Sequence, residues 1–195
     1  MSDIPTDSSV DQGRRTWVAI TAGAGALGGA AVAVPFVSTF SPSERAKAAG
    51  AAVEADISGL KPGEKMTVEW RGKPVWIVRR TPEQVAALKK LDPQLADPDS
   101  KRNPGELTPP YARNTGRSIK PEFMVAVGIC SHLGCSPSEK FTVGAQPSLP
   151  DDWQGGFLCP CHGSTFDMAG RVFKNKPAPD NLEVPPHMYL SDARL

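Results

Sequence analysis

The sequence has almost no excess of charge of either sign, since 22 lysines and arginines balance 21 aspartates and glutamates to a net charge of +1. A polyanion partner requires a basic surplus, so the composition gives no reason to expect nucleic acid or another strongly charged partner. No internal repeat is evident, and cysteine and histidine are scarce, with four and three copies. Glycine (18) and proline (20) are plentiful instead, which is typical of a loop-rich, mainly β fold.

The few cysteines and histidines are gathered in one part of the sequence. All four cysteines and two histidines lie between residues 130 and 162. Cysteines that only fill a core would not cluster in this way, so we expect a metal site, a disulfide or both. The third histidine, His187, lies outside this segment and is predicted to be a surface or strand residue.

Charge is absent from Thr16 to Val37, directly after Arg14 and Arg15. As a helix this run would extend about 33 Å, enough to cross a bilayer. A buried soluble helix and a cleaved signal peptide are the alternatives, and the paired arginines resemble a twin-arginine export signal. We predict a retained single-pass anchor over residues 16–37, preceded by a cytoplasmic tail over residues 1–15 that carries the signal.

The segment after the anchor, residues 38–52, is rich in small residues and lacks an apolar face. We expect a flexible hinge here, with a passive linker as the alternative. It would connect the anchor to one domain, residues 53–195.

That domain begins with β structure. Two apolar runs flank Arg71-Gly72 and predict a hairpin. Thr81-Pro82-Glu83-Gln84 is a capping box that opens a short helix through about Leu91. Residues 92–121 are rich in proline and predict a long irregular segment.

Two apolar strands, residues 123–129 and 155–158, are each followed at once by a cysteine. Both therefore deliver the chain to a loop that could hold a metal. The later apolar runs 171–173 and 187–190 predict further strands of a small antiparallel structure.

The two loops have the sequences CSHLGC (130–135) and CPCHGS (159–164). Each offers one cysteine and one histidine, as Cys-x-His and Cys-x-x-His. A structural zinc site would accept this set, but Cys-x-His is a tight spacing for zinc and leaves two cysteines unexplained. A mixed cysteine and histidine set on two loops is also what a Rieske [2Fe–2S] cluster requires, with two histidines on one iron.

Both loops resemble those of the Rieske iron–sulfur subunit of bacterial ubiquinol–cytochrome c reductase, the respiratory cytochrome bc complex. The resemblance runs from the paired arginines through WRGKPVWIVRRT (70–81) to KPAPDNLEVPP (176–186). It implies a mainly β fold: a small antiparallel Rieske domain with one short helix, preceded by a transmembrane helix. Its cluster-binding part, about residues 123–180, would be inserted in a base β-sandwich.

The resemblance also implies a role for each loop residue. Two thiolates on the buried iron and two imidazoles on the outer iron would hold the cluster: Cys130, Cys159, His132 and His162. Cys135 and Cys161 would form a disulfide that ties the loops together, worth on the order of 3 kcal/mol in the chain-entropy model. Ser164 would donate its hydroxyl to a bridging sulfide, which raises the potential of the cluster.

Five positions near the ligands carry further expectations. Leu133 has two readings, loop packing or a place on the docking surface. Pro177 and Pro179 belong to a loop that would cover the third side of the cluster, although Lys176 stands where the family usually has glycine. Phe166 occupies a position where respiratory members often carry tyrosine, whose hydroxyl bonds a ligand cysteine.

The function implied is one-electron transfer within an oxidoreductase that translocates protons. The subunit would take an electron from ubiquinol, with the proton passing to His162 or His132, and deliver the electron to a c-type haem. The implied partners are cytochrome b, a c-type cytochrome and membrane lipid, in a dimeric assembly on the periplasmic side of a bacterial inner membrane. Two alternatives are a Rieske subunit of another membrane redox enzyme, such as arsenite oxidase, and a zinc-stapled interaction domain.

Overall fold

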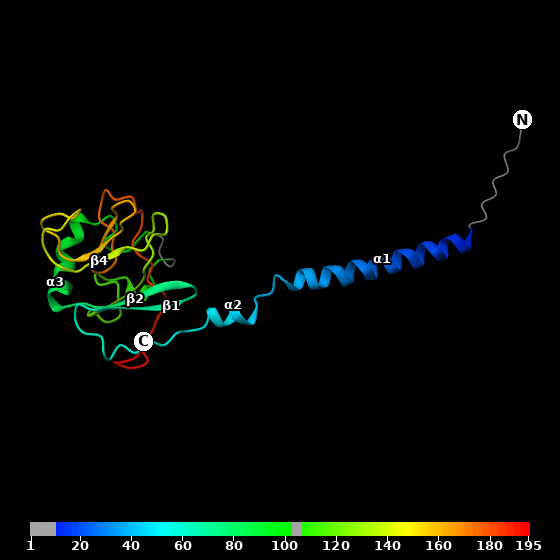
Figure 1. The fold of residues 1–195 in the computed structure, drawn as a ribbon, viewed down its shortest axis with the longest axis horizontal. Coiled ribbons are helices and arrows are strands. Elements are labelled where there is room, and N and C mark those ends of the chain that lie inside the picture. Colours follow the sequence, from blue (N-terminus) through cyan, green and yellow to red (C-terminus); the bar gives the residue numbers. More distant parts are fainter. Residues whose placement is uncertain (1–10, 103–106) are drawn as a thin grey trace, which may run out of the picture. The chain divides into compact units, whose positions relative to one another are not determined.

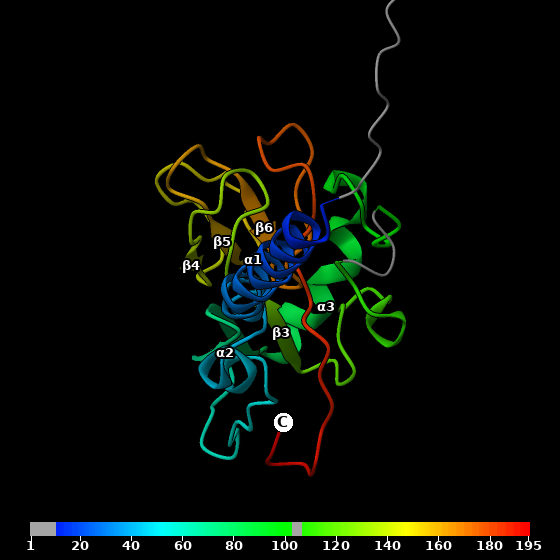
Figure 2. The same cartoon turned by 90° about the vertical axis from the view of Figure 1, so that its right-hand side faces the viewer.

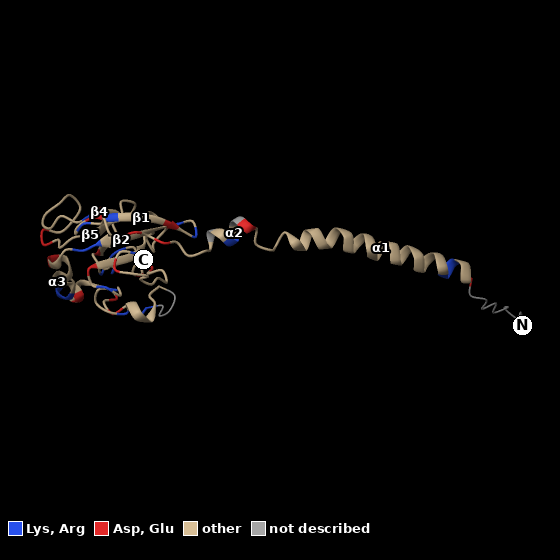
Figure 3. Ribbon diagram, turned by 90° about the horizontal axis from the view of Figure 1, so that it is seen from below, with Lys and Arg blue, Asp and Glu red and all other residues tan. Residues whose placement is uncertain are grey.

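The computed structural model describes residues 11–102 and 107–195, and the chain divides into two compact units, residues 1–48 and 49–195. The first unit consists mainly of one long helix, α1 (Gln12–Ser38) (Figure 1). This helix is long and apolar enough to cross a membrane, and none of its side chains is buried within the chain. In Figure 3 nearly all of α1 is free of charged residues, as the sequence requires.

A second, short helix, α2 (Glu44–Ala49), lies within the segment predicted to be a hinge. Lys47 Nζ pairs with Glu44 Oε1 at 2.7 Å on its exposed surface. This helix was not predicted, because no apolar stripe marks it in the sequence. Its alanines explain why it forms, since alanine has the highest helix propensity.

A three-stranded antiparallel sheet forms the base of the second unit, in the order β1 (Lys65–Trp70), β2 (Lys73–Arg79) and β3 (Phe123–Val127). Arg71 and Gly72 connect β1 to β2 with φ angles of 52° and 70°. Two successive left-handed residues form the tight turn that matches strand twist, so the predicted hairpin is confirmed.

β2 and β3 are buried on both faces, which explains their unbroken apolar sequences. Alternate residues of the two strands face two different hydrophobic clusters. One face contributes Val75, Ile77, Phe123, Val125 and Val127, and the opposite face contributes Trp76, Val78, Met124 and Ala126.

The segment between β2 and β3 begins with α3 (Pro82–Leu91), whose capping box is present as predicted. Thr81 Oγ1 accepts from the Gln84 backbone N–H, and the Gln84 side chain accepts from the Thr81 N–H. The rest of the described segment contains only two short 3₁₀ turns, η1 (Asp92–Gln94) and η2 (Pro110–Ala112), which confirms its irregular character.

The second sheet is antiparallel in the order β4 (Ser138–Lys140), β5 (Gly156–Leu158) and β6 (Thr165–Asp167), side by side in Figure 2. β4 was not predicted, because three polar residues carry no strand pattern. Trp76 of β2 stacks on Phe157 of β5 at 4.9 Å and so joins the two sheets.

The strands predicted at 171–173 and 187–190 are wrong. Residues 171–173 make only isolated bridges, because the Val172 N–H donates to the Asn181 side chain instead of extending a ladder. At 187–190 no strand forms, and the His187 N–H donates to the hydroxyl of Tyr111.

Gly128, directly after β3, has no room for a side chain. A Cβ at this position would overlap the indole ring of Trp76, which is itself buried. We expect Gly128→Ala to cost about 1–3 kcal/mol through overpacking and to lower the thermal unfolding midpoint of the purified protein. Gly59→Ala is the matched control, since nothing lies within 4 Å of its Cβ position. Equal midpoints for the two variants would contradict this packing argument.

Candidate metal centre

The two cysteine loops share one backbone design. We call residues 130–135 loop 1 and residues 159–164 loop 2. In each loop the first residue donates its N–H to the carbonyl of the sixth, at 2.8 Å in loop 1 and 2.7 Å in loop 2. The fifth residue donates its N–H back to the carbonyl of the first, at 3.1 and 3.0 Å. Each loop is therefore closed on itself before any metal is considered.

The fifth residue of each loop is a glycine with a left-handed backbone conformation. Gly134 and Gly163 have φ angles of 83° and 75°, in the left-handed region that other residues rarely adopt. The strands before the loops place the first residues, since Cys130 follows β3 closely and Cys159 follows β5 directly.

Cys135 of loop 1 and Cys161 of loop 2 form a disulfide, with their Cα atoms 6.7 Å apart. This confirms the predicted pairing. The Cys159 sulfur lies within 4.8 Å of both disulfide sulfurs. Because the two bonded sulfurs have no thiolate to offer, this trio is not a ligand set, and Cys159 is the member able to bind a metal.

The two free thiols, Cys130 and Cys159, are each only 2 % exposed. Burial raises the pKa of the Cys130 thiol, and the adjacent Cys159 thiol raises it further, against the lowering effect of hydrogen bonds from the His132 backbone and Ser164. Burial therefore favours the neutral form of the Cys130 thiol until a cation is present. A metal that binds thiolate would supply that cation.

The two loop histidines lie nearer the surface, His132 half-buried and His162 exposed. Their imidazole rings approach edge to face with centroids 4.7 Å apart. The donor set is thus divided by depth, with the thiols inside and the imidazoles outside. This division fits a centre with two irons of unlike ligation better than a single zinc bound by all four groups.

Ser164 is fully buried beside the thiols, and its Oγ accepts the backbone N–H of Ala178 at 2.9 Å. That bond leaves the hydroxyl proton free to be donated toward sulfur. It also attaches loop 2 to residues 176–181, which we call the proline loop.

Ser131, which was not predicted as a site residue, attaches loop 1 to the same proline loop. Its Oγ donates to the Asp180 carbonyl at 2.7 Å and accepts the Asp180 N–H at 3.2 Å. Pro177 and Pro179 are exposed on this loop, and the Pro179 carbonyl accepts from Arg102 Nη1 at 2.7 Å. A hydroxyl residue beside a cysteine in a metal loop was the only signal in the sequence.

Ser131→Ala should loosen the proline loop, because it removes both bonds to Asp180. Two lost hydrogen bonds cost about 1–2 kcal/mol, so the temperature at which iron is released should fall. The exposed loop residue Ser136 offers the matched control, Ser136→Ala. If iron release occurs at the same temperature in both variants, Ser131 does not hold the proline loop.

The remaining predicted positions differ in burial: Leu133 is exposed, Phe166 is buried and His187 is half-buried. Leu133 is 71 % exposed at the tip of loop 1. Phe166 is fully buried in the hydrophobic cluster that also contains Cys130 and Cys159. His187 lies outside the loops with Nδ1 at 2.8 Å from the Pro185 carbonyl, and burial lowers its pKa.

Comparison with known proteins agrees with this geometry. Residues 113–186 match the family described as "Rieske [2Fe-2S] domain". The chain is 56 % identical, over 93 % of its length and 86 % of the relative's, to the ubiquinol-cytochrome c reductase iron-sulfur subunit of Allochromatium vinosum. Proteins of the same name from Bradyrhizobium diazoefficiens and Rickettsia prowazekii are 38 % and 35 % identical. These two alignments cover 97 % and 100 % of this chain, and 97 % and 98 % of the relatives.

Among solved structures, a chain of "Hyperthermophilic respiratory Complex III" aligns over 91 % of this chain and 98 % of its own length. Its identity of 26 % and TM-score of 0.47 are too low to carry an argument. The relatives that align over nearly the whole chain show the family, and together with the matched domain they indicate the cofactor, a [2Fe–2S] cluster. This chain belongs to the bacterial Rieske iron–sulfur subunits of ubiquinol–cytochrome c reductase.

Proposed function

We propose that the protein is the subunit that moves single electrons from ubiquinol to a c-type haem. The observation that supports this most directly is the layered donor set, in which buried thiols lie beneath imidazoles that face solvent. An electron carrier must shield its metal from water and still offer a contact point to its partners. The loops tied by the disulfide meet both requirements.

The cluster would be held by Cys130 and Cys159 on the inner iron and by His132 and His162 on the outer iron. When bound, it supplies a one-electron acceptor whose potential is raised by neutral imidazole ligands. Ser164 would donate its hydroxyl proton to a sulfur of the centre, which spreads negative charge.

The exposed histidine is the proposed contact for ubiquinol. His162 would accept the quinol hydroxyl proton at its outer ring nitrogen, with the ring of His132 as its neighbour. Leu133 would form the apolar part of the same docking tip, because an exposed leucine beside two imidazoles favours an amphipathic partner.

The anchor and hinge complete the proposal. Residues 16–37 would cross the inner membrane once, with the domain of residues 53–195 on the periplasmic side. Cytochrome b and a c-type cytochrome would be the partner subunits, in a dimeric assembly surrounded by membrane lipid. Residues 38–52, which include α2, would let the domain move between the quinol and the haem.

Purification of the full chain from its native membranes tests this proposal. We expect cytochrome b and a c-type cytochrome to copurify, and the complex to reduce cytochrome c when ubiquinol is added. Copurification with a molybdenum-containing arsenite oxidase would contradict the proposal. A colourless zinc protein without a paramagnetic resonance signal after reduction would contradict it as well.

The missing hydroxyl at Phe166 gives a prediction on the potential. Phe166→Tyr should raise the midpoint potential by a few tens of millivolts, since about 1 kcal/mol of added stabilisation of the reduced centre corresponds to roughly 40 mV for one electron. Redox titration monitored by paramagnetic resonance measures this shift. Phe141→Tyr is the control, because Phe141 only packs against the edge of the same hydrophobic cluster. An unchanged or lower potential in Phe166→Tyr would refute the prediction.

A further inference from the structure

Three arginines are almost completely buried, with exposed fractions of 2 % for Arg80, 1 % for Arg117 and 0 % for Arg171. Arginine is seldom buried to this extent unless it is paired with a carboxylate. Arg171 meets that condition, because it contacts Asp167 at 2.7 Å and Asp92 at 2.8 Å. Within the described residues, Arg80 and Arg117 have no such partner.

The guanidinium groups of Arg80 and Arg117 donate hydrogen bonds to neutral acceptors among the described residues. Arg80 donates to carbonyl oxygens and one hydroxyl, those of Gly116, Met168, Phe123 and Ser118. Arg117 donates in the same manner to Leu107, Thr108, Ala169, Gly170 and Leu182. Nε of each side chain has no partner among the described atoms.

Both groups nevertheless stay charged at neutral pH. Burial lowers the pKa of Arg80 and of Arg117 to about 10, while the attraction of Asp167 opposes the shift. A pKa near 10 still leaves each guanidinium protonated at pH 7. The fold therefore keeps two positive charges inside, where desolvation disfavours them.

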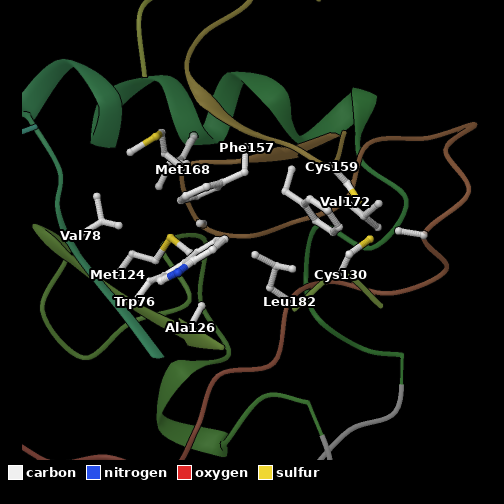
Figure 4. Close-up of a cluster of buried hydrophobic side chains, with 14 residues drawn as sticks. Trp76, Val78, Met124, Ala126, Cys130, Phe157, Cys159, Met168, Val172 and Leu182 are labelled. Atoms are coloured by element: carbon white, nitrogen blue, oxygen red, sulfur yellow. The ribbon is translucent and has the colours of Figure 1, made fainter. Parts of the chain in front are cut away.

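These charges lie against the hydrophobic cluster that also contains the two loop thiols. Met168, Ala169 and Leu182, whose carbonyls accept the guanidinium hydrogens, pack in the hydrophobic cluster that includes Cys130 and Cys159. Figure 4 shows four of these five side chains in that one cluster, Met168, Leu182, Cys130 and Cys159. Because this shared cluster is made of hydrophobic side chains, it screens charge much less than water does.

We propose that Arg80 and Arg117 tune the metal centre, in that their buried positive charge favours the reduced state and raises its reduction potential. The inference rests on the [2Fe–2S] cluster of the proposed function. A purely structural role would require only hydrogen-bond donors, which a neutral amide side chain supplies without the cost of burying charge.

Redox titration of full-length protein in membranes, followed by paramagnetic resonance, separates charge from hydrogen bonding. Arg117→Gln removes the charge, whereas Arg117→Lys keeps it and loses the fork of donors. We expect Arg117→Gln to lower the equilibrium constant for one-electron reduction about three- to tenfold, which corresponds to about 30–59 mV. Arg117→Lys should leave it nearly unchanged. Arg80→Gln and Arg80→Lys should behave in the same manner.

Lys176→Gln is the matched control, because Lys176 is a cation on the proline loop that is exposed to water. Solvent screening should limit its effect to well below that of Arg117→Gln. The proposal is overturned if Arg117→Gln and Arg117→Lys lower the potential equally, or if neither lowers it. Should Arg117→Gln assemble no centre, a tenfold fall of the reduction equilibrium constant in Arg117→Lys would still overturn it.

The potential is measured on the chain itself, without turnover. A failure of quinol oxidation with these shifts intact would contradict the proposed function and leave this inference standing. If the potentials do not shift in a complex that oxidises quinol, this inference is contradicted and the proposed function stands.

Discussion

Replacing Cys159 with alanine is expected to abolish the iron–sulfur centre. Cys159 is the thiol that the disulfide leaves free beside Cys130, so its loss removes half of the inner thiolate pair. The inner iron would keep the thiolate of Cys130 as its single protein ligand and would be open to water. We expect iron and acid-labile sulfide to fall from two atoms of each per chain to about zero, and the paramagnetic resonance signal to vanish.

Val172→Ala is the control for packing. Val172 is fully buried in the same hydrophobic cluster, and its truncation costs about 1–3 kcal/mol without removing a ligand. This variant should keep its iron and its resonance signal. Iron and sulfide near two per chain in Cys159→Ala would contradict the proposed ligand set, however the control behaves.

The double variant Cys135→Ala, Cys161→Ala is expected to keep the centre but to hold it less firmly. The disulfide joins residues 26 positions apart, and closing such a loop is worth about 3 kcal/mol. At about 2–4 °C per kcal/mol for a chain of this size, the temperature of iron release should fall by about 6–12 °C. Changing both cysteines together avoids leaving one thiol next to Cys159.

Treatment of wild-type protein with a thiol reductant gives an independent comparison, because it opens the bond without changing the sequence. It should lower the release temperature to a similar extent. An unchanged temperature in the double variant would mean that the backbone hydrogen bonds of each loop suffice. The role of the disulfide as a stabilising link between the loops would then be wrong.

Much of the fold follows from local patterns in the sequence. The Arg71-Gly72 turn and the Thr81 capping box each depend on a few adjacent residues, and both were predicted with their correct ends. The Cys135–Cys161 pair was named from the resemblance of the loops, and the structure bears it out. The cluster ligands stay a prediction, because only a metal can test them.

What could not be predicted depends on contacts between distant residues. The bond from Ser131 to Asp180 spans 49 positions, and no local pattern marks it. At Val172 no strand continues, because its N–H donates to the side-chain amide of Asn181, nine positions away. No sequence pattern marks Arg80 and Arg117 as buried, since charge normally indicates exposure, yet they are buried.

The shared backbone of loops 1 and 2 has a consequence for which side chains reach the surface. Aligned by their hydrogen bonds, Cys130 corresponds to Cys159 and Leu133 corresponds to His162. The fourth position is exposed in both loops, so the same turn presents an apolar side chain from one loop and an imidazole from the other. The third positions also correspond, and there His132 matches the disulfide cysteine Cys161. One backbone turn thus carries two different sets of chemical groups, because its hydrogen bonds need only a glycine at the fifth position.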